Sequence, residues 1–164
     1  MNIWVRIKQL SIKQLLQLAF LFARKPLYIQ PTIRATKETM KLCDAKFGRA
    51  HHKSNRSNAF RHALWNYLIC RNILKIAKNS QKALIWAEKV TKTYEKVTNN
   101  NILDEVMDLH NNEIGRKVFF EQKSLKLTEI DRFLEEKLQK AIKIVQIEDI
   151  NNAEGQLVYI LEKW

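Results

Sequence analysis

Two short runs of the sequence combine polar and ionisable residues with the apolar residues of a buried helix. The first is Asn-Ala-Phe-Arg-His-Ala-Leu-Trp-Asn, residues 58–66, and the second is Asp-Leu-His-Asn-Asn-Glu-Ile-Gly, residues 108–115. A helix that is apolar around most of its circumference belongs in a protein interior, where an unpaired polar group costs roughly 1–3 kcal/mol. A polar stripe on such a helix therefore predicts either a functional site or a fully hydrogen-bonded network.

Helical spacing places the polar residues of the first run on one side of its helix. At about 100° per residue, Asn58, His62 and Asn66 lie one turn apart on that side, and Arg61 lies at its margin. We expect this side to face the second run, with Arg61 paired to a carboxylate or an anion at the rim of the site.

The second run carries two adjoining stripes. His110 lies in the middle of an apolar stripe, and the neighbouring stripe consists of Asp108, Asn111 and Gly115. A glycine inside a helix costs about 1 kcal/mol relative to alanine. Gly115 therefore predicts the close approach of another helix or of a ligand.

These residue types suit the hydrolysis of a phosphoester, a carboxylic ester or a glycoside. A histidine oriented by a carboxylate activates water near neutral pH, and arginine or asparagine side chains hold an anionic group. We predict that His62 is the general base, Asp108 its orienting partner or a metal ligand, and His110 a second acid/base group or ligand. The residues expected to position substrate are Arg61, Asn58, Asn66, Asn111 and Asn112.

The same side chains allow two other interpretations. His62, Asp108 and His110 could hold a divalent metal ion with Glu105 or Glu113, although their spacing differs from the His-Glu-x-x-His zinc signature. Alternatively, the stripes form a hydrogen-bonded network that only specifies core packing. The sequence leaves these alternatives open.

The positive charge of the chain is concentrated in its first half. Residues 1–87 carry 17 Lys and Arg against two acidic residues, a net charge of +15, whereas residues 88–164 have a net charge of −3. Such a basic half favours an anionic partner: nucleic acid, lipid head groups or a cell-wall polymer. No helix-turn-helix or zinc-finger pattern is visible, which argues against sequence-specific DNA binding.

The spacing of apolar residues predicts a single all-α domain over residues 1–164, a compact bundle of about six helices. A buried central helix covers 58–77, capped by Ser57 or Asn58, and residues 50–120 form the core that carries both runs. The other helices are expected at about 1–25, 31–47, 80–98, 102–122, 128–147 and, as a short final helix, 149–164.

Residues 1–25 are expected to form an amphipathic basic helix that ends before Pro26. We expect it to pack against the core, and contact with a membrane surface is the alternative. Its apolar run is too short to cross a bilayer, and no cleavage site typical of a secretory signal follows it. The cations expected on its exposed side are Arg6, Lys8, Lys13, Arg24 and Lys25.

The remaining cysteines and histidines give weaker signals. Cys43 and Cys70 lie on separate expected helices without metal-site spacing, so we expect buried free thiols. His51 and His52 lie in a polar, basic stretch, residues 48–57, which is expected to be a flexible loop able to close over a substrate.

The two runs resemble the paired motifs of an uncharacterised bacterial family of all-helical domains. Members of that family are small stand-alone proteins or terminal domains of larger, often toxin-like secreted proteins. The match covers about residues 50–120 and implies no particular activity. The polar positions that the resemblance implies the family shares are Arg61, His62, Asp108, His110, Asn111, Asn112 and Gly115.

A fainter similarity links Arg61-His62 to the Arg-His-Asp helix of small bacterial phospholipases A2, but Ala63 stands in place of the calcium-binding aspartate. The leading hypothesis is a small toxin-like hydrolase that acts on an anionic polymer or lipid, with a divalent metal ion as an optional cofactor. The alternative is a non-enzymatic basic module that binds nucleic acid or a membrane surface. We expect synthesis in the cytoplasm, with action there, at a membrane or after secretion without a conventional signal peptide.

Overall fold

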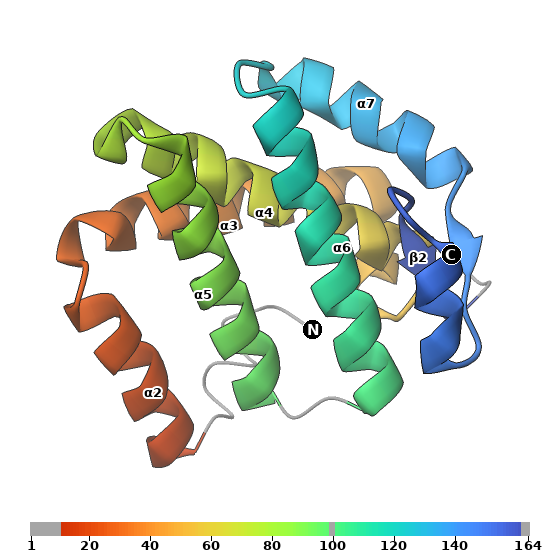
Figure 1. Cartoon of the computed structure of the whole chain (residues 1–164), viewed down its shortest axis with the longest axis horizontal. Helices are drawn as coiled ribbons and strands as arrows, with labels where there is room; N and C mark the ends of the chain where they lie inside the picture. The colour runs from red at the N-terminus through yellow and green to blue at the C-terminus, as the bar shows by residue number, and fades with distance from the viewer. Residues whose placement is uncertain (1–10, 99–100, 162–164) are drawn as a thin grey trace.

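Helices account for most of residues 11–98 and 101–161, which the computed structural model describes (Figure 1). The all-α class expected from the sequence is confirmed. Within these two ranges the α-helices are α2 (Ile12–Ala23), α3 (Ile29–Phe47), α4 (Arg56–Ala77), α5 (Ser80–Thr98), α6 (Ile102–Glu121) and α7 (Leu127–Gln139). Two short 3₁₀ turns, η1 (Pro26–Tyr28) and η2 (Ala50–His52), precede α3 and α4.

Helix α4 is the centre of the bundle. Of its 22 residues 15 are buried, and α3, α5, α6 and α7 all pack against it. Helices α5 and α6 run side by side along one face of α4 (Figure 1). The cap differs from the expected one: Asn55, rather than Ser57 or Asn58, accepts a hydrogen bond through its side chain from the backbone N–H of Asn58 at 3.2 Å.

The crossing of α4 and α6 depends on Gly115. A Cβ atom at this position would lie 2.1 Å from the backbone carbonyl oxygen of Ala63, which is far inside the sum of their van der Waals radii. The close approach predicted for Gly115 is therefore an approach of helix α4. This contact brings the polar side of α4 directly against α6.

The C-terminal region departs from the expected helices. Helix α7 ends at Gln139, and the chain continues into strand β1 (Ile142–Lys143), the 3₁₀ turn η3 (Ile147–Asn152) and strand β2 (Val158–Tyr159), which pairs in parallel with β1. The Asn111 side chain explains part of this difference. Its amide accepts a hydrogen bond from the backbone N–H of Val158 and donates one to the carbonyl of the same residue, both at 2.9 Å.

Helix α2 is the least buried helix of the bundle. None of its residues is fully buried, and only Leu21 and Phe22 pack against the main core. The three basic residues predicted on its exposed side that the structure describes, Lys13, Arg24 and Lys25, are exposed, and Arg6 and Lys8 lie outside the described residues. No helix among the described residues is long and apolar enough to cross a membrane.

Both cysteines are buried free thiols, as expected. Burial raises the pKa of Cys43 and of Cys70 to about 12, so both remain protonated at neutral pH.

Candidate site between helices α4, α5 and α6

Three ionisable side chains from three different helices meet in the interior. They are His62 of α4, Glu95 of α5 and Asp108 of α6, which are 2%, 1% and 4% exposed. His62 Nε2 lies 3.2 Å from Asp108 Oδ1, and His62 Nδ1 lies 3.6 Å from Glu95 Oε1. The imidazole ring therefore has a carboxylate on each side, one of which, Asp108, was expected to face it.

The geometry of these side chains suits a metal ion. One potential ligand atom from each of His62, Glu95 and Asp108 lies within 4.8 Å of the other two. A nitrogen and two carboxylate oxygens form a donor set that first-row divalent metals accept, zinc and manganese included. Two carboxylates in the interior also require a compensating positive charge.

Arg61 brings one positive charge to this cluster. Its NH2 nitrogen lies 2.6 Å from His62 Nε2, and its NH1 nitrogen lies 3.5 Å from His52 Nδ1. Among the described residues it forms no ion pair with a carboxylate, and its pairing with an anion at the rim stays a prediction. The long side chain bends across the adjacent histidine instead of diverging from it.

Two asparagines lie on the other side of the His62 ring. Asn112 Oδ1 is 3.1 Å from His62 Nδ1 and accepts a hydrogen bond of 2.6 Å from Asn66 Nδ2. Asn66 Oδ1 accepts a hydrogen bond of 3.0 Å from Arg116 NH1. Asn66 and Asn112 are fully buried next to His62. Their role in substrate binding stays a prediction.

Two of the predicted site residues, His110 and Asn111, form hydrogen bonds with the C-terminal segment instead. His110 is half-buried, and its Nε2 lies 2.8 Å from the backbone carbonyl oxygen of Gln156. Asn111 binds the backbone of Val158, as described above. Residues two apart on a helix point about 200° away from each other, so Asp108 in the cluster places His110 on a different face. The predicted catalytic and metal-binding roles of His110 find no geometric support.

The remaining predicted asparagine, Asn58, and the two alternative acids also lie outside the cluster contacts. Asn58 is buried, and its side-chain oxygen has no hydrogen-bond partner among the described residues. Glu113 is exposed and forms an ion pair of 2.8 Å with Lys117. Glu105 is half-buried on the first turn of α6. Neither acid joins the group that could hold a metal.

Glu95 is the residue that sequence reasoning misses. A signal for it exists in the spacing of α5, because Ala87, Thr91 and Glu95 recur every four residues and all three are buried. A carboxylate in line with buried positions is a candidate for a functional or paired acid. Glu95 takes the place that the sequence interpretation gave to Glu105 or Glu113.

A second group of ionisable side chains lies beyond Arg61. Asp44, His51 and His52 also place potential ligand atoms within 4.8 Å of one another. His51 is buried within η2, contrary to the expected flexible loop, and its Nε2 lies 2.8 Å from Asp44 Oδ1. Burial lowers the pKa of His51, and burial together with the neighbouring His51 lowers the pKa of His52 to about 4. The ring of His52 is therefore neutral at pH 7.

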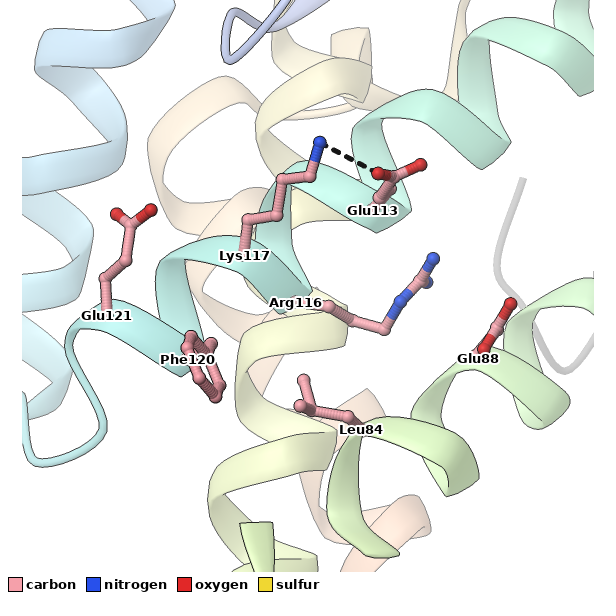
Figure 2. A pocket seen from close by; sticks show the side chains of 7 residues that line it. All are labelled: Leu84, Glu88, Glu113, Arg116, Lys117, Phe120 and Glu121. Carbon is pink, nitrogen blue, oxygen red and sulfur yellow. Dashed lines mark ion pairs between the residues drawn. The ribbon is translucent and has the colours of Figure 1, made fainter. Parts of the chain in front are cut away.

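A groove of about 460 Å³ opens between α5 and α6. Figure 2 shows Arg116 extending from α6 across this groove toward Glu88 of α5, with the Lys117–Glu113 ion pair beside it. The residues that line the groove are Leu84, Glu88, Glu113, Arg116, Lys117, Phe120 and Glu121. None of His62, Glu95 and Asp108 lines the groove. Arg116 connects the groove to these residues, because it donates a hydrogen bond to Asn66, which in turn contacts His62.

A comparison of the sequence with known proteins identifies its family. Residues 19–143 match a family described as "Domain of unknown function (DUF6973)". The chain belongs to the DUF6973 family. The match extends well beyond the 50–120 range of the paired motifs and includes all of α3 to α7, hence His62, Glu95 and Asp108. No curated protein and no solved structure matches the chain.

Proposed function

We propose that this DUF6973 domain is a metal-assisted hydrolase whose site consists of His62, Glu95 and Asp108. The convergence of these three side chains from three helices carries the proposal. Arg61 supplies one positive charge against two buried carboxylates, which leaves a negative charge that would attract a cation. A divalent ion held there would polarise a substrate oxygen and lower the pKa of a bound water toward about 7.

The remaining residues of the site favour an anionic substrate. Arg61 lies against the ring of His62 and next to His52, where its guanidinium would bind a phosphate or carboxylate group in two-point fashion. The net charge of +15 over residues 1–87 would attract such a substrate. We therefore propose an anionic polymer or lipid as substrate, and a toxin-like bacterial role as the paired motifs imply.

Metal binding and hydrolysis test this proposal together. After treatment with a chelator, the protein is titrated with Zn²⁺, Mn²⁺, Mg²⁺ or Ca²⁺ by isothermal calorimetry and assayed on p-nitrophenyl phosphate, bis-p-nitrophenyl phosphate, RNA and phosphatidylglycerol vesicles. We expect one ion per chain and hydrolysis that depends on it. Salt-sensitive binding of RNA without metal binding or turnover would instead support the non-enzymatic module.

A membrane surface is a second proposed partner, favoured by the outer face of α2. Ile12, Leu16 and Phe20 recur every four residues and are 78%, 63% and 62% exposed. All charges between residues 11 and 37 are positive, and the Arg24 guanidinium lies 4.3 Å above the Phe20 ring. An apolar stripe bordered by cations fits the interface of an anionic bilayer.

Vesicle flotation checks this second proposal. We expect the protein to float with phosphatidylglycerol vesicles at low salt and to remain unbound with neutral phosphatidylcholine vesicles. Replacing Leu16 and Phe20 by Ser should weaken binding about tenfold or more, because both side chains would leave the apolar layer. Val145→Ser is the control, since Val145 is 72% exposed at a distant position. Equal binding of the double variant and the control would refute a membrane role for α2.

A further inference from the structure

A chain of three polar side chains leads from the groove in Figure 2 to the ring of His62: Arg116, Asn66 and Asn112. We propose that Asn66, oriented by Arg116, is a positioning residue that fixes the tautomer of His62. In this tautomer the ring carries its proton on Nδ1, and Nε2, on the side of Asp108 and Arg61, is the basic nitrogen.

The orientation of the Asn66 amide is determined by two neighbours. A guanidinium has only N–H donors, so the atom that faces Arg116 NH1 at 3.0 Å must be the oxygen of Asn66. The nitrogen of Asn66 then donates to the backbone carbonyl of His62 at 3.2 Å. A flipped amide would place donor against donor at Arg116 and oxygen against oxygen at the carbonyl.

The orientation of Asn66 determines that of Asn112. Asn66 presents its N–H group at 2.6 Å, so Asn112 must accept with its oxygen. The same oxygen faces His62 Nδ1 at 3.1 Å, and an oxygen acceptor requires a proton on that nitrogen. The cost of this orientation is visible, since the nitrogen of Asn112 has no hydrogen-bond partner among the described residues.

The opposite side of the ring gives independent support. Arg61 NH2 lies 2.6 Å from His62 Nε2, and because arginine can only donate, Nε2 must accept with its lone pair. Nε2 also lies 3.2 Å from Asp108 Oδ1, which can only accept, but the shorter contact places the Arg61 donor nearer to this nitrogen. The contacts of Asn112 and Arg61 therefore favour the same tautomer. Arg116 lies one turn after Asn112 on the same side of α6 and takes part in the site through Asn66, without a contact to the ring.

This inference gives Asn66 and Asn112 a role different from substrate binding. Its chemical importance rests on the proposed function, in which the Nε2 lone pair would exchange its contact with Arg61 for a metal ion or a proton. Side chains that hydrogen-bond to a metal-ligating histidine commonly fix its tautomer. Replacing such a side chain costs about 10–100-fold in metal affinity. The tautomer itself does not depend on any metal.

Nitrogen NMR of the histidine side chains tests the proposal. The chain has four histidines, so ¹⁵N-edited spectra that correlate ring nitrogens with ring protons can be assigned with one His→Gln variant per residue. In the wild-type protein at pH 7.5 we expect His62 Nδ1 to be protonated and Nε2 to be unprotonated. A His62 ring protonated on Nε2 would overturn the proposal without any variant.

Two variants, each of which adds one negative charge, distinguish an effect of the tautomer from an effect of charge alone. Asn66→Asp can no longer donate, so Asn112 would turn its nitrogen toward His62 Nδ1 and the proton would move to Nε2. Asn112→Asp can only accept, so the proton would stay on Nδ1. We expect Zn²⁺ affinity to fall about 10–100-fold in Asn66→Asp. The proposal fails if Asn66→Asp retains the proton on Nδ1 or if Asn112→Asp loses it.

The outcome is separable from that of the proposed function. The expected tautomer in a protein that binds no metal and hydrolyses nothing would support this inference and refute the hydrolase. Lys117→Gln serves as the control, because Lys117 follows Arg116 on the same helix but pairs with Glu113 at the surface. This control should leave the His62 resonances and the affinity for Zn²⁺ unchanged.

Discussion

Asp108→Asn is expected to lower metal-dependent hydrolysis by about 10²–10⁴-fold while leaving the fold intact. Asparagine has nearly the same shape as aspartate, so the packing of α6 against α4 should persist. The substitution removes the negative charge that lies 3.2 Å from His62 Nε2 and offers a much weaker metal ligand. Calorimetric titration with Zn²⁺ and the rate on the best substrate of the panel measure the two effects.

Glu113→Gln is the matched control for this variant. It removes one carboxylate from the same helix, but from an exposed position paired with Lys117. We expect its metal affinity and rate to be within about twofold of the wild-type values, because exposed ion pairs contribute little. If Asp108→Asn retained full activity, or if both variants lost activity equally, the role proposed for Asp108 would have to be abandoned.

Gly115→Ala is expected to destabilise the protein by about 3 kcal/mol or more, or to prevent folding. In an ordinary helix this substitution would stabilise by about 1 kcal/mol. Here the added methyl group would lie 2.1 Å from the carbonyl oxygen of Ala63, so α4 and α6 would have to separate along their whole interface. Urea unfolding followed by circular dichroism measures the change.

The control for the glycine variant is Lys117→Ala. Lys117 lies two residues further along α6, and its side chain is 53% exposed. Its replacement should change the free energy of unfolding by less than about 1 kcal/mol. Stability of Gly115→Ala equal to or above that of the wild type would show that the two helices do not approach each other as closely as described.

The helices of the bundle could be predicted because their signals are local. Helical spacing of apolar residues, together with Gly48 after α3 and the asparagines before α6, places α3, α4, α5 and α6 within two residues of their observed bounds. The region after α7 could not be predicted in this way. Its structure depends on contacts distant in sequence, such as those of Asn111 with Val158.

The same distinction between local signals and contacts distant in sequence applies to the candidate site. The contact of His62 with Asp108 follows from two polar stripes on buried helices, which helical spacing makes visible. Glu95 lies outside the two polar runs, so only its alignment with buried positions of α5 marks it. His110 belongs to the second run by proximity in sequence, but its direction around α6 takes it to Gln156.

The two hydrogen bonds between the Asn111 side chain and the Val158 backbone also affect self-association of the protein. A strand with an unpaired edge can recruit the same strand from another molecule and so begin aggregation. Strand β2 pairs with β1 on one side, its residue Val158 binds the Asn111 amide, and the segment after it pairs with the backbone of Ser54. The Asn111 amide therefore occupies backbone groups of β2 that a strand of another molecule would need for pairing. The same two hydrogen bonds hold β2 against helix α6.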